Sequence, residues 1–284
     1  MSYLLKIAFA PGLFFLSVAS GLFLVSQGAP LWTLGLVLLA AIALSFVSEQ
    51  LIPYQRDWNE SKGDRTRDLL HFIVNEGTIA YSTLLIPLFA AIVPGDGIWP
   101  SHWPLWAQLA IAIVVADCGI TLAHYASHRG GILWRLHAVH HSVKRMYGFN
   151  GLMKHPLHQA VEITAGTTPL ILAGMPVEIA ALLSLAVATQ LLLQHSNVDM
   201  KIGPLRLIWA VAPVHRFHHL NKSGEGDVNF GLFLTVWDRI LGTAYFDRSR
   251  TIVSEEIGIE GEPDYPVNYL RQLLEPFRSV TAQD

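Results

Sequence analysis

Long apolar runs constrain the fold of this chain more than any other feature of its sequence. Hydrophobic residues make up 52% of its 284 positions, and the mean hydropathy is +0.39. A helix needs about 17–25 predominantly apolar residues to cross a bilayer. Four runs reach that length, and a shorter apolar pair interrupted at GMP follows them: Leu4–Val25, Leu31–Val47, Leu69–Val93, Leu105–Ala126, then Ala160–Ala173 and Val177–Gln194. The sequence therefore predicts an all-α integral membrane protein with about four transmembrane helices plus an apolar helical hairpin.

Basic residues in the connecting loops predict the orientation of these helices, because cytoplasmic loops carry an excess of Lys and Arg. Lys6 lies near the start of the first run, and the polar stretch Tyr54–Asp68 contains four Lys or Arg residues. The loop PGDGIWPSHWP before the fourth run contains none and carries Trp99 and Trp103 as interfacial anchors. The N-terminus and the inner end of the fourth helix are thus expected on the cytoplasmic side. The histidine-rich region that follows this helix and the more polar segment Leu220–Asp284 are expected to form a helical cap on the same side. We expect N-terminal transmembrane helices over residues 1–104, a catalytic region over 105–250 and a cytoplasmic tail over 251–284.

Histidines are concentrated in three short motifs, HYASH, LHAVHH and VHRFHH, which hold eight of the 13 in the chain. Side chains three or four residues apart share one face of a helix, so each motif is expected to direct its imidazoles to one place. Neutral imidazole is a common metal ligand and suits iron, zinc and copper. The predicted ligands are His124, His128, His137, His140, His141, His215, His218 and His219.

This histidine set favours a site for more than one metal ion over the alternatives. A lone buried histidine is usually a core residue, but eight at helical spacing, in a chain with only 14% charged residues, are hard to explain in that way. A metalloprotease of the HExxH type needs a glutamate beside its first histidine, where this chain has Tyr125. Eight imidazoles are too many for one tetrahedral zinc. The single Cys118 excludes a cysteine-ligated iron–sulfur cluster within the chain, and the net charge of −3 gives no argument for nucleic acid.

The three motifs, in this order, resemble those of the fatty acid hydroxylase/sterol desaturase superfamily of membrane-bound di-iron oxygenases. The resemblance extends to LW before the second motif, HP after it and NFGLFLTVWDRILGT after the third, and it covers Asp117–Thr243. It implies a dioxygen-dependent attack on a lipid C–H bond at two iron ions, for which zinc can substitute in purified samples. It also implies a separate electron donor, such as a reductase, a ferredoxin or a cytochrome b5, because the chain contains no nucleotide-binding fingerprint or cytochrome domain of its own.

Several residues outside the motifs are further candidates. His195 and His155 match isolated histidines of the family and are expected metal ligands, with a core role as the alternative. Intramembrane carboxylates are functional candidates by default. Asp117, which shares the helix face of His124, is therefore expected to support a ligand by hydrogen bonding, with a helix-packing hydrogen bond as the alternative. Asp199 and Asn229 are expected either to support the ligands in the same way or to anchor loops.

The sequence leaves the substrate and the outcome of the reaction open. The segment MYGFNGLMKHPLH departs from the family pattern at Tyr147, Asn150, Met153 and His158, which puts substrate and regiochemistry in doubt but not the metal site. Hydroxylation and desaturation share the same first hydrogen abstraction, so sequence does not separate them. The alternative function is a non-catalytic membrane protein that binds or transports zinc or haem.

Overall fold

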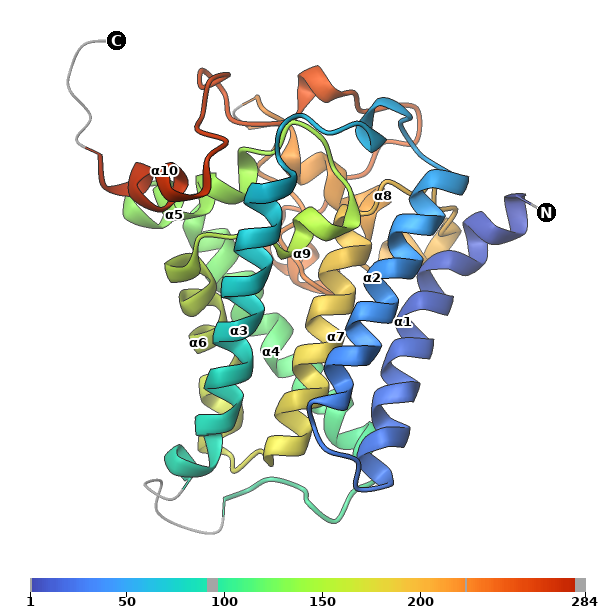
Figure 1. The fold of residues 1–284 in the computed structure, drawn as a ribbon, viewed down its shortest axis with the longest axis vertical. Helices are drawn as coiled ribbons and strands as arrows, with labels where there is room; N and C mark the ends of the chain where they lie inside the picture. The colour runs from blue at the N-terminus through green and yellow to red at the C-terminus, as the bar shows by residue number, and fades with distance from the viewer. Residues whose placement is uncertain (1, 91–96, 223, 279–284) are drawn as a thin grey trace.

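The computed structural model describes residues 2–90, 97–222 and 224–278, and this part of the chain is helical, with isolated β-bridges in place of strands. Six long helices lie side by side (Figure 1). They are α1 (Ser2–Ser26), α2 (Thr33–Leu51), α3 (Arg65–Ala90), α4 (Leu105–Ser127), α6 (Pro156–Leu172) and α7 (Val177–His195). The shorter helices are η1 (Asp57–Asn59), α5 (Gly131–His141), η2 (Gly148–Leu152), η3 (Gly203–Leu207), α8 (Ala212–His215), η4 (Arg216–His219), α9 (Val236–Leu241), η5 (Ser254–Glu256), α10 (Tyr269–Leu274) and η6 (Glu275–Phe277).

The long helices confirm the predicted class of an all-α membrane protein. Among the described residues, α1, α2, α4 and α7 are long and apolar enough to cross a bilayer. Helix α3 is also long, but Arg67, Asp68, Asn75 and Glu76 make it less apolar than the predicted third span. That predicted span ended at Val93, and its last three residues lie outside the part that the structure describes. The predicted hairpin is present as α6 and α7, and α7 is the limb with the length and hydropathy of a full span.

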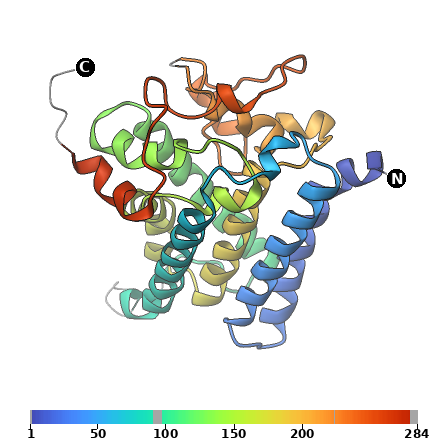
Figure 2. The same ribbon diagram turned by 45° about the horizontal axis from the view of Figure 1, so that its top comes forward.

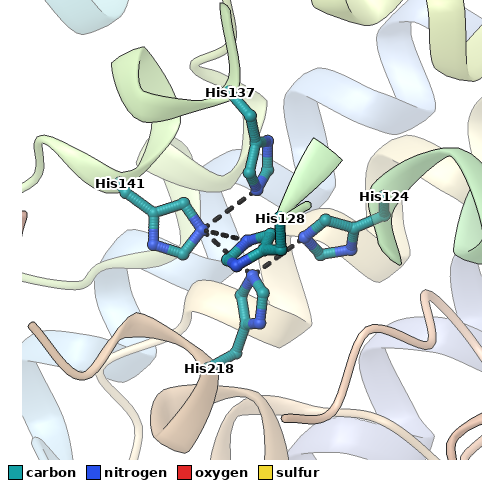
Figure 3. A group of neighbouring side chains, drawn as sticks. All are labelled: His124, His128, His137, His141 and His218. Atoms are coloured by element: carbon teal, nitrogen blue, oxygen red, sulfur yellow. Dashed lines mark hydrogen bonds between the residues drawn. The ribbon is translucent and has the colours of Figure 1, made fainter. Parts of the chain in front are cut away.

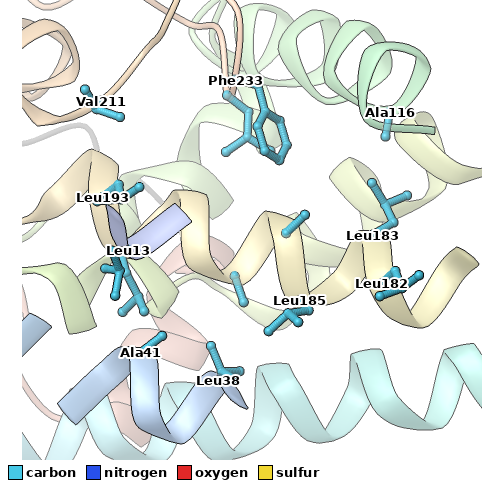
Figure 4. Close-up of a cluster of buried hydrophobic side chains, with 14 of the residues drawn as sticks. Leu13, Leu38, Ala41, Ala116, Leu182, Leu183, Leu185, Leu193, Val211 and Phe233 are labelled. Atoms are coloured by element: carbon cyan, nitrogen blue, oxygen red, sulfur yellow. The ribbon is translucent and has the colours of Figure 1, made fainter. Parts of the chain in front are cut away.

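Helix α7 lies at the centre of the apolar core because neighbours cover it on several sides. Leu182, Leu185 and Leu193 of α7 are almost fully buried, and they lie between residues of α1, α2 and α4 in the same hydrophobic cluster (Figure 4). The cluster also takes in Val211 and Phe233 from the cap, by which we mean the short helices and loops of residues 128–155, 196–222 and 224–278. The core thus fixes the C-terminal end of α7 against the cap segments.

Small residues allow α4 and α6 to pack closely, as is common between helices in membranes. A Cβ atom added to Gly119 of α4 would lie 2.2 Å from the carbonyl oxygen of Ala165 of α6. One added to Gly166 would lie 2.9 Å from the side chain of Ile120. This contact holds the beginning of α6 near the end of α4, where the first histidine motif lies.

The cap gathers at one end of the helix bundle (Figures 1 and 2). The N-terminal end of α1 lies there too, because Lys6 forms an ion pair with Asp199 at 2.7 Å. The C-terminal segment covers this end as well: the buried amide of Gln272 donates to Ser142 and pairs with His71 at 2.9 Å. The N-terminus and all three histidine motifs therefore share one side of the bundle, as the sequence predicted, while which side of a membrane this is stays a prediction.

Candidate metal centre

Nine histidines converge in two groups at the C-terminal ends of α4 and α7. In each group the ring nitrogens that face inward lie within 4.8 Å of one another. The five-histidine group is drawn in Figure 3 and consists of His124, His128, His137, His141 and His218. The four-histidine group consists of His140, His195, His215 and His219. All eight motif histidines are therefore brought together, and His195 joins them.

The ring nitrogens of the five-histidine group are too close and too numerous to be satisfied by one another. The Nε2 atom of His141 lies 3.0 Å from those of His137 and His218, and 3.2 Å from that of His128. The Nε2 atoms of His124 and His218 are 2.8 Å apart. One nitrogen cannot share a single hydrogen with three others. Two nitrogens bound at right angles to one metal ion, at about 2.1 Å each, are about 3 Å apart, so the spacing fits a metal ion between the rings.

The ring nitrogens of the four-histidine group are also unsatisfied, here because they lack hydrogen-bond partners. Five of its buried ring nitrogens have no hydrogen-bond partner among the described residues: both nitrogens of His215, both of His219 and Nε2 of His195. An unsatisfied buried polar atom costs about 1–3 kcal/mol. A metal ion bound by one nitrogen of each ring would remove most of that cost, and the donor chemistry fits a second ion here.

The outer nitrogens of several rings are held by hydrogen bonds, which is how proteins orient histidine ligands. The Nδ1 atoms of His124, His140 and His218 contact the carbonyl oxygens of Phe230, Met153 and Val228 at 2.8–2.9 Å. The Nδ1 atom of His128 pairs with the Asp227 carboxylate at 2.9 Å, and that of His195 with the Asn150 amide oxygen at 3.1 Å. These contacts leave Nε2 of each ring to face inward.

The expectation that each motif directs its imidazoles to one place is wrong for the two later motifs, because each contributes histidines to both groups. In α5, His137 and His141 are one turn apart and enter the five-histidine group, whereas His140 points to the other. In the third motif, His218 enters the five-histidine group while His215 and His219 enter the other. The third motif changes from α-helix to 3-10 helix at Arg216, so its three rings are not on one face of a regular helix. Only the first motif directs all its imidazoles to one group.

Burial keeps these rings neutral. It lowers the pKa of the cap histidines well below the ordinary value, and neighbouring imidazoles lower it further; this applies to His137, His140, His141, His215, His218 and His219. Burial also lowers the pKa of His128, although Asp227 opposes the shift. Metal ligation requires neutral imidazole, so the rings are in the form that binds a metal ion at neutral pH.

The loop Asn229–Trp237 is anchored below the site by Asp117 and Asn229. The Asp117 carboxylate accepts hydrogen bonds from the backbone N–H groups of Leu232, Phe233 and Leu234 and from the Trp237 indole, at 2.8–3.1 Å. Asn229 has a positive φ of 55° and donates to the carbonyl oxygens of Val214 and Tyr245. Asp117 therefore contacts the loop that carries the Phe230 carbonyl, and does not contact a histidine ring itself.

The other candidates lie apart from the two groups. Asp199 pairs with Lys6 and Lys201 at the cap surface. His155 caps the start of α6, where its Nδ1 accepts from the Leu157 N–H, and its Nε2 contacts the Leu273 carbonyl at 3.2 Å. Both ring nitrogens of His155 are thus engaged outside the metal groups. His158 belongs to neither group, although its ring lies against that of His137 with centroids 4.4 Å apart, and it pairs with Ser127 at 2.9 Å.

Two supporting residues were missed in the sequence. Asp227 lies in an ordinary polar loop, and no spacing rule connects it with His128, 99 positions earlier. Asn150 was noted only as a departure from the family pattern. It belongs to η2, which lies so close to α7 that a Cβ on Gly151 would be 2.3 Å from the Leu191 carbonyl oxygen. The NG pair in this segment is a signal that could have indicated such a close approach.

Comparison with known proteins agrees with this geometry. The family model described as fatty acid hydroxylase matches residues 109–243. The ornithine lipid hydroxylase OlsE of Rhizobium tropici is 33% identical over 256 residues, which covers 87% of this chain and 76% of that protein. The chain belongs to the fatty acid hydroxylase superfamily. Alkylglycerol monooxygenases of Danio rerio and Homo sapiens are 30% and 27% identical, over about half of this chain and 31% and 33% of their own length. No solved structure matches it significantly.

The part of the chain that the family model matches contains the histidine site. Residues 109–243 include most of α4 and all of α5, α7, α8 and η4, and so all nine histidines of the two groups. Apolar helices of membrane-crossing length surround the region, so the chain is a multi-pass membrane protein of this superfamily with a metal-binding histidine site.

Proposed function

We propose that this protein is a membrane-bound oxygenase that hydroxylates a C–H bond of a lipid, with dioxygen as the oxidant. The observation that carries the proposal is the convergence of nine buried histidines in two adjacent groups within a chain of the fatty acid hydroxylase superfamily. The names of its relatives support a lipid substrate, because they describe a hydroxylase of ornithine lipids and monooxygenases of alkylglycerols.

The two groups would hold two iron ions, which supply the redox chemistry that amino-acid side chains lack. In the net reaction one C–H bond becomes C–O–H. One oxygen atom of dioxygen enters the product, and the other leaves as water. Two electrons and two protons are required, and the names of the lipid-modifying relatives support a separate protein as the donor of the electrons. The chain's own residues bind the ions, keep the rings neutral and fix their directions through Asp227, Asn150 and the backbone carbonyls.

The site is proposed to face the cytoplasm, where a reductase, ferredoxin or cytochrome b5 could reach it. The argument rests on the loop charges and on the shared end of the bundle: Lys6 reaches Asp199 of the cap. A cysteine replacing Ser2 near the N-terminus, labelled with a membrane-impermeant reagent in intact cells and in inverted vesicles, tests this orientation. Labelling in intact cells would refute it.

The test of the activity is lipid mass spectrometry on cells that express the protein under labelled dioxygen. The wild type is expected to add one labelled oxygen atom to at least one lipid, and the His140→Ala and His218→Ala variants are expected to add none. The exposed His102, outside both groups, provides a matched control: His102→Ala should retain the labelled product. Loss of two hydrogens without label would indicate a desaturase. No lipid change, with a donor system present and both ions bound, would favour the alternative of a non-catalytic metal-binding protein.

A further inference from the structure

Glu49 is a buried carboxylate near the C-terminal end of α2, next to the cap. The residue is 2% exposed. Its Oε1 atom accepts hydrogen bonds from the backbone N–H groups of Gly148 at 2.7 Å and Asn197 at 3.1 Å, and from the Ser45 hydroxyl at 3.3 Å. None of these three donors carries a charge. Because a buried charge is costly unless an opposite charge compensates it, a cation is expected nearby.

Arg216 is a buried cation close to the same residues. It directly follows His215 in the third motif and is 4% exposed. Its Nη2 atom donates to the carbonyl oxygens of Ser196 at 2.7 Å and Val198 at 2.9 Å, and its guanidinium lies 3.8 Å from the centroid of the Tyr54 ring. These partners are uncharged, and Nε finds no hydrogen-bond partner in the described part of the chain. Since arginine stays protonated in proteins, Arg216 also requires a compensating charge.

The two charged side chains hold opposite sides of the segment 196–198, which directly follows His195. Glu49 binds the N–H group and Arg216 the carbonyl group of one peptide unit, that between Ser196 and Asn197. In a trans peptide these two groups point in opposite directions. The N–H carries partial positive charge and the carbonyl oxygen partial negative charge, so each side chain meets the polarity that it attracts. We call this arrangement the charge clamp: Glu49, Arg216 and the segment 196–198 between them.

The other charges of this region leave Glu49 and Arg216 to compensate each other. Two carboxylates attract Arg216, those of Asp199 and Glu49. Asp199 already pairs with Lys6 at 2.7 Å and with Lys201 at 2.8 Å. The histidine rings of the four-histidine group are neutral, but the ion proposed there adds positive charge close to Arg216, which directly follows one of these rings in the chain. The negative charge of Glu49 therefore favours both the burial of Arg216 and the binding of that ion.

The charge clamp supports His195 from two directions. His195 is the last residue of α7, so its backbone continues directly into the clamped segment. Its ring is oriented by Asn150 of η2, whose amide oxygen lies 3.1 Å from Nδ1. The Glu49 oxygen that binds the clamped segment also binds the N–H of Gly148, the first residue of η2. Arg216 adds the third motif, to which it belongs. One pair of charges thus connects α7, η2 and the third motif around the four-histidine group.

We propose that Glu49 and Arg216 are positioning residues for the four-histidine group. Neither is a metal ligand. Together they hold the segment 196–198 so that the His195 ring reaches the ion that the third motif also binds. This inference rests on the metal binding that the proposed function requires, and it adds two residues outside the set of histidines. It also gives a role to the charge of Glu49, which an apolar helix would otherwise not be expected to contain.

The metal affinity of the purified full chain tests the positioning role. Cobalt(II) is titrated in competition with a coloured chelator, and the wild type should bind two ions, one in each group. Glu49→Gln and Arg216→Gln should each weaken the binding of one ion about 10–100-fold, as loss of a residue that orients a ligand generally does. Asp199→Asn is the matched control, because this carboxylate directly follows the clamped segment but pairs with lysines at the cap surface, and it should keep both affinities. Unchanged affinities in the two clamp variants, or an equal loss in the control, would overturn the inference.

The sign of the effect at Arg216 separates positioning from simple electrostatics. Removal of a positive charge beside a metal ion would by itself tighten the binding of the ion. Tighter binding in Arg216→Gln would therefore overturn the positioning role. Arg216→Lys keeps the charge and can still donate to the carbonyl groups, so it should recover part of the lost affinity and the visible absorption of cobalt seen in the wild type, which depends on the number and geometry of the ligands. No recovery would contradict the clamp.

Melting temperatures of the proteins as purified test the coupling between the two charges. Each single variant leaves one buried charge uncompensated and should lower the melting temperature by about 5–8 °C. The double variant Glu49→Gln, Arg216→Gln removes both charges, so it should lose clearly less than the sum of the two single losses. Additive losses would overturn the charge clamp. A wild type that binds fewer than two ions would instead refute the proposed metal sites, and the melting temperatures would still decide whether Glu49 and Arg216 are coupled.

Discussion

Replacement of Asp117 by asparagine should weaken both the fold and the metal site, although Asp117 touches no histidine. Its carboxylate accepts four hydrogen bonds, three from backbone N–H groups of the loop after Phe230 and one from the Trp237 indole. Asparagine is nearly the same size but has only one acceptor oxygen. Its NH2 group would face two of the four donors, so at least two hydrogen bonds would be lost in a buried place.

The magnitude follows from the number of lost bonds. A hydrogen bond to a charged group contributes about 1.5–3 kcal/mol. Two lost bonds therefore lower the free energy of unfolding by about 3–6 kcal/mol, or about 5–10 °C in melting temperature for a chain of this size. The loop also carries the carbonyl of Phe230, which holds the His124 ring at 2.9 Å, so metal affinity should fall with stability.

The assay combines thermal unfolding of the purified protein in detergent with its metal content by mass spectrometry. Asp199→Asn is the control, because Asp199 pairs only with Lys6 and Lys201 at the cap surface and should change melting by at most a few degrees, with metal content unchanged. The reasoning would be refuted if Asp117→Asn melted like the wild type with full metal content, or if both variants lost metal equally.

Three further perturbations separate the roles of neighbouring residues. His195→Ala should lower the bound metal by about one ion per chain, whereas His155→Ala, which removes a helix cap outside both groups, should leave the metal content unchanged in the same elemental analysis. Burial would raise the pKa of Asp64, but the hydrogen bonds and charge of Arg145 hold it below its ordinary value, so its contribution to stability is complete above about pH 4 and disappears as the pH falls further. In the Asp64→Asn variant the melting temperature should therefore fall less steeply with decreasing pH in the acid range than it does in the wild type. An unchanged slope would contradict the role given to Asp64. Gly151→Ala should lower stability by forcing η2 away from α7, where its Cβ would meet the Leu191 carbonyl oxygen at 2.3 Å; a melting temperature equal to that of the wild type would show that the two elements can separate without cost.

The sequence predicted the helices and the convergence of the motif histidines well, because both depend on strong local patterns. Apolar runs of bilayer length form helices in any membrane context. Histidines at helical spacing indicate metal binding directly, because both the ligand type and the spacing can be read in the sequence. His195 could be added only through the family resemblance, because a single histidine at the end of an apolar run has no spacing partner.

The contacts that hold the rings could not be predicted in the same way. Three of the five oxygen partners are backbone carbonyls, of Phe230, Met153 and Val228, and a carbonyl gives no sign in the sequence of the ring that it will meet. Asp199 and Asp227 are both polar residues on the cap, and only the folded chain places one beside a surface lysine and the other beside His128. Composition and spacing predict which atoms are available, whereas their pairing depends on how loops cross in space.

The histidines of α5 are divided between the two groups, so the two metal sites cannot be assembled independently of each other. His140 and His141 are consecutive, yet their rings face different groups with centroids 5.8 Å apart, and the same holds for His218 and His219 at 5.4 Å. A small rotation of either segment would therefore displace ligands of both groups at once. A metal ion bound in one group fixes α5 and η4, and so reduces the conformational freedom that the second ion would otherwise have to restrict. Binding of the two ions should be positively coupled, because both groups are built on the same two backbone segments.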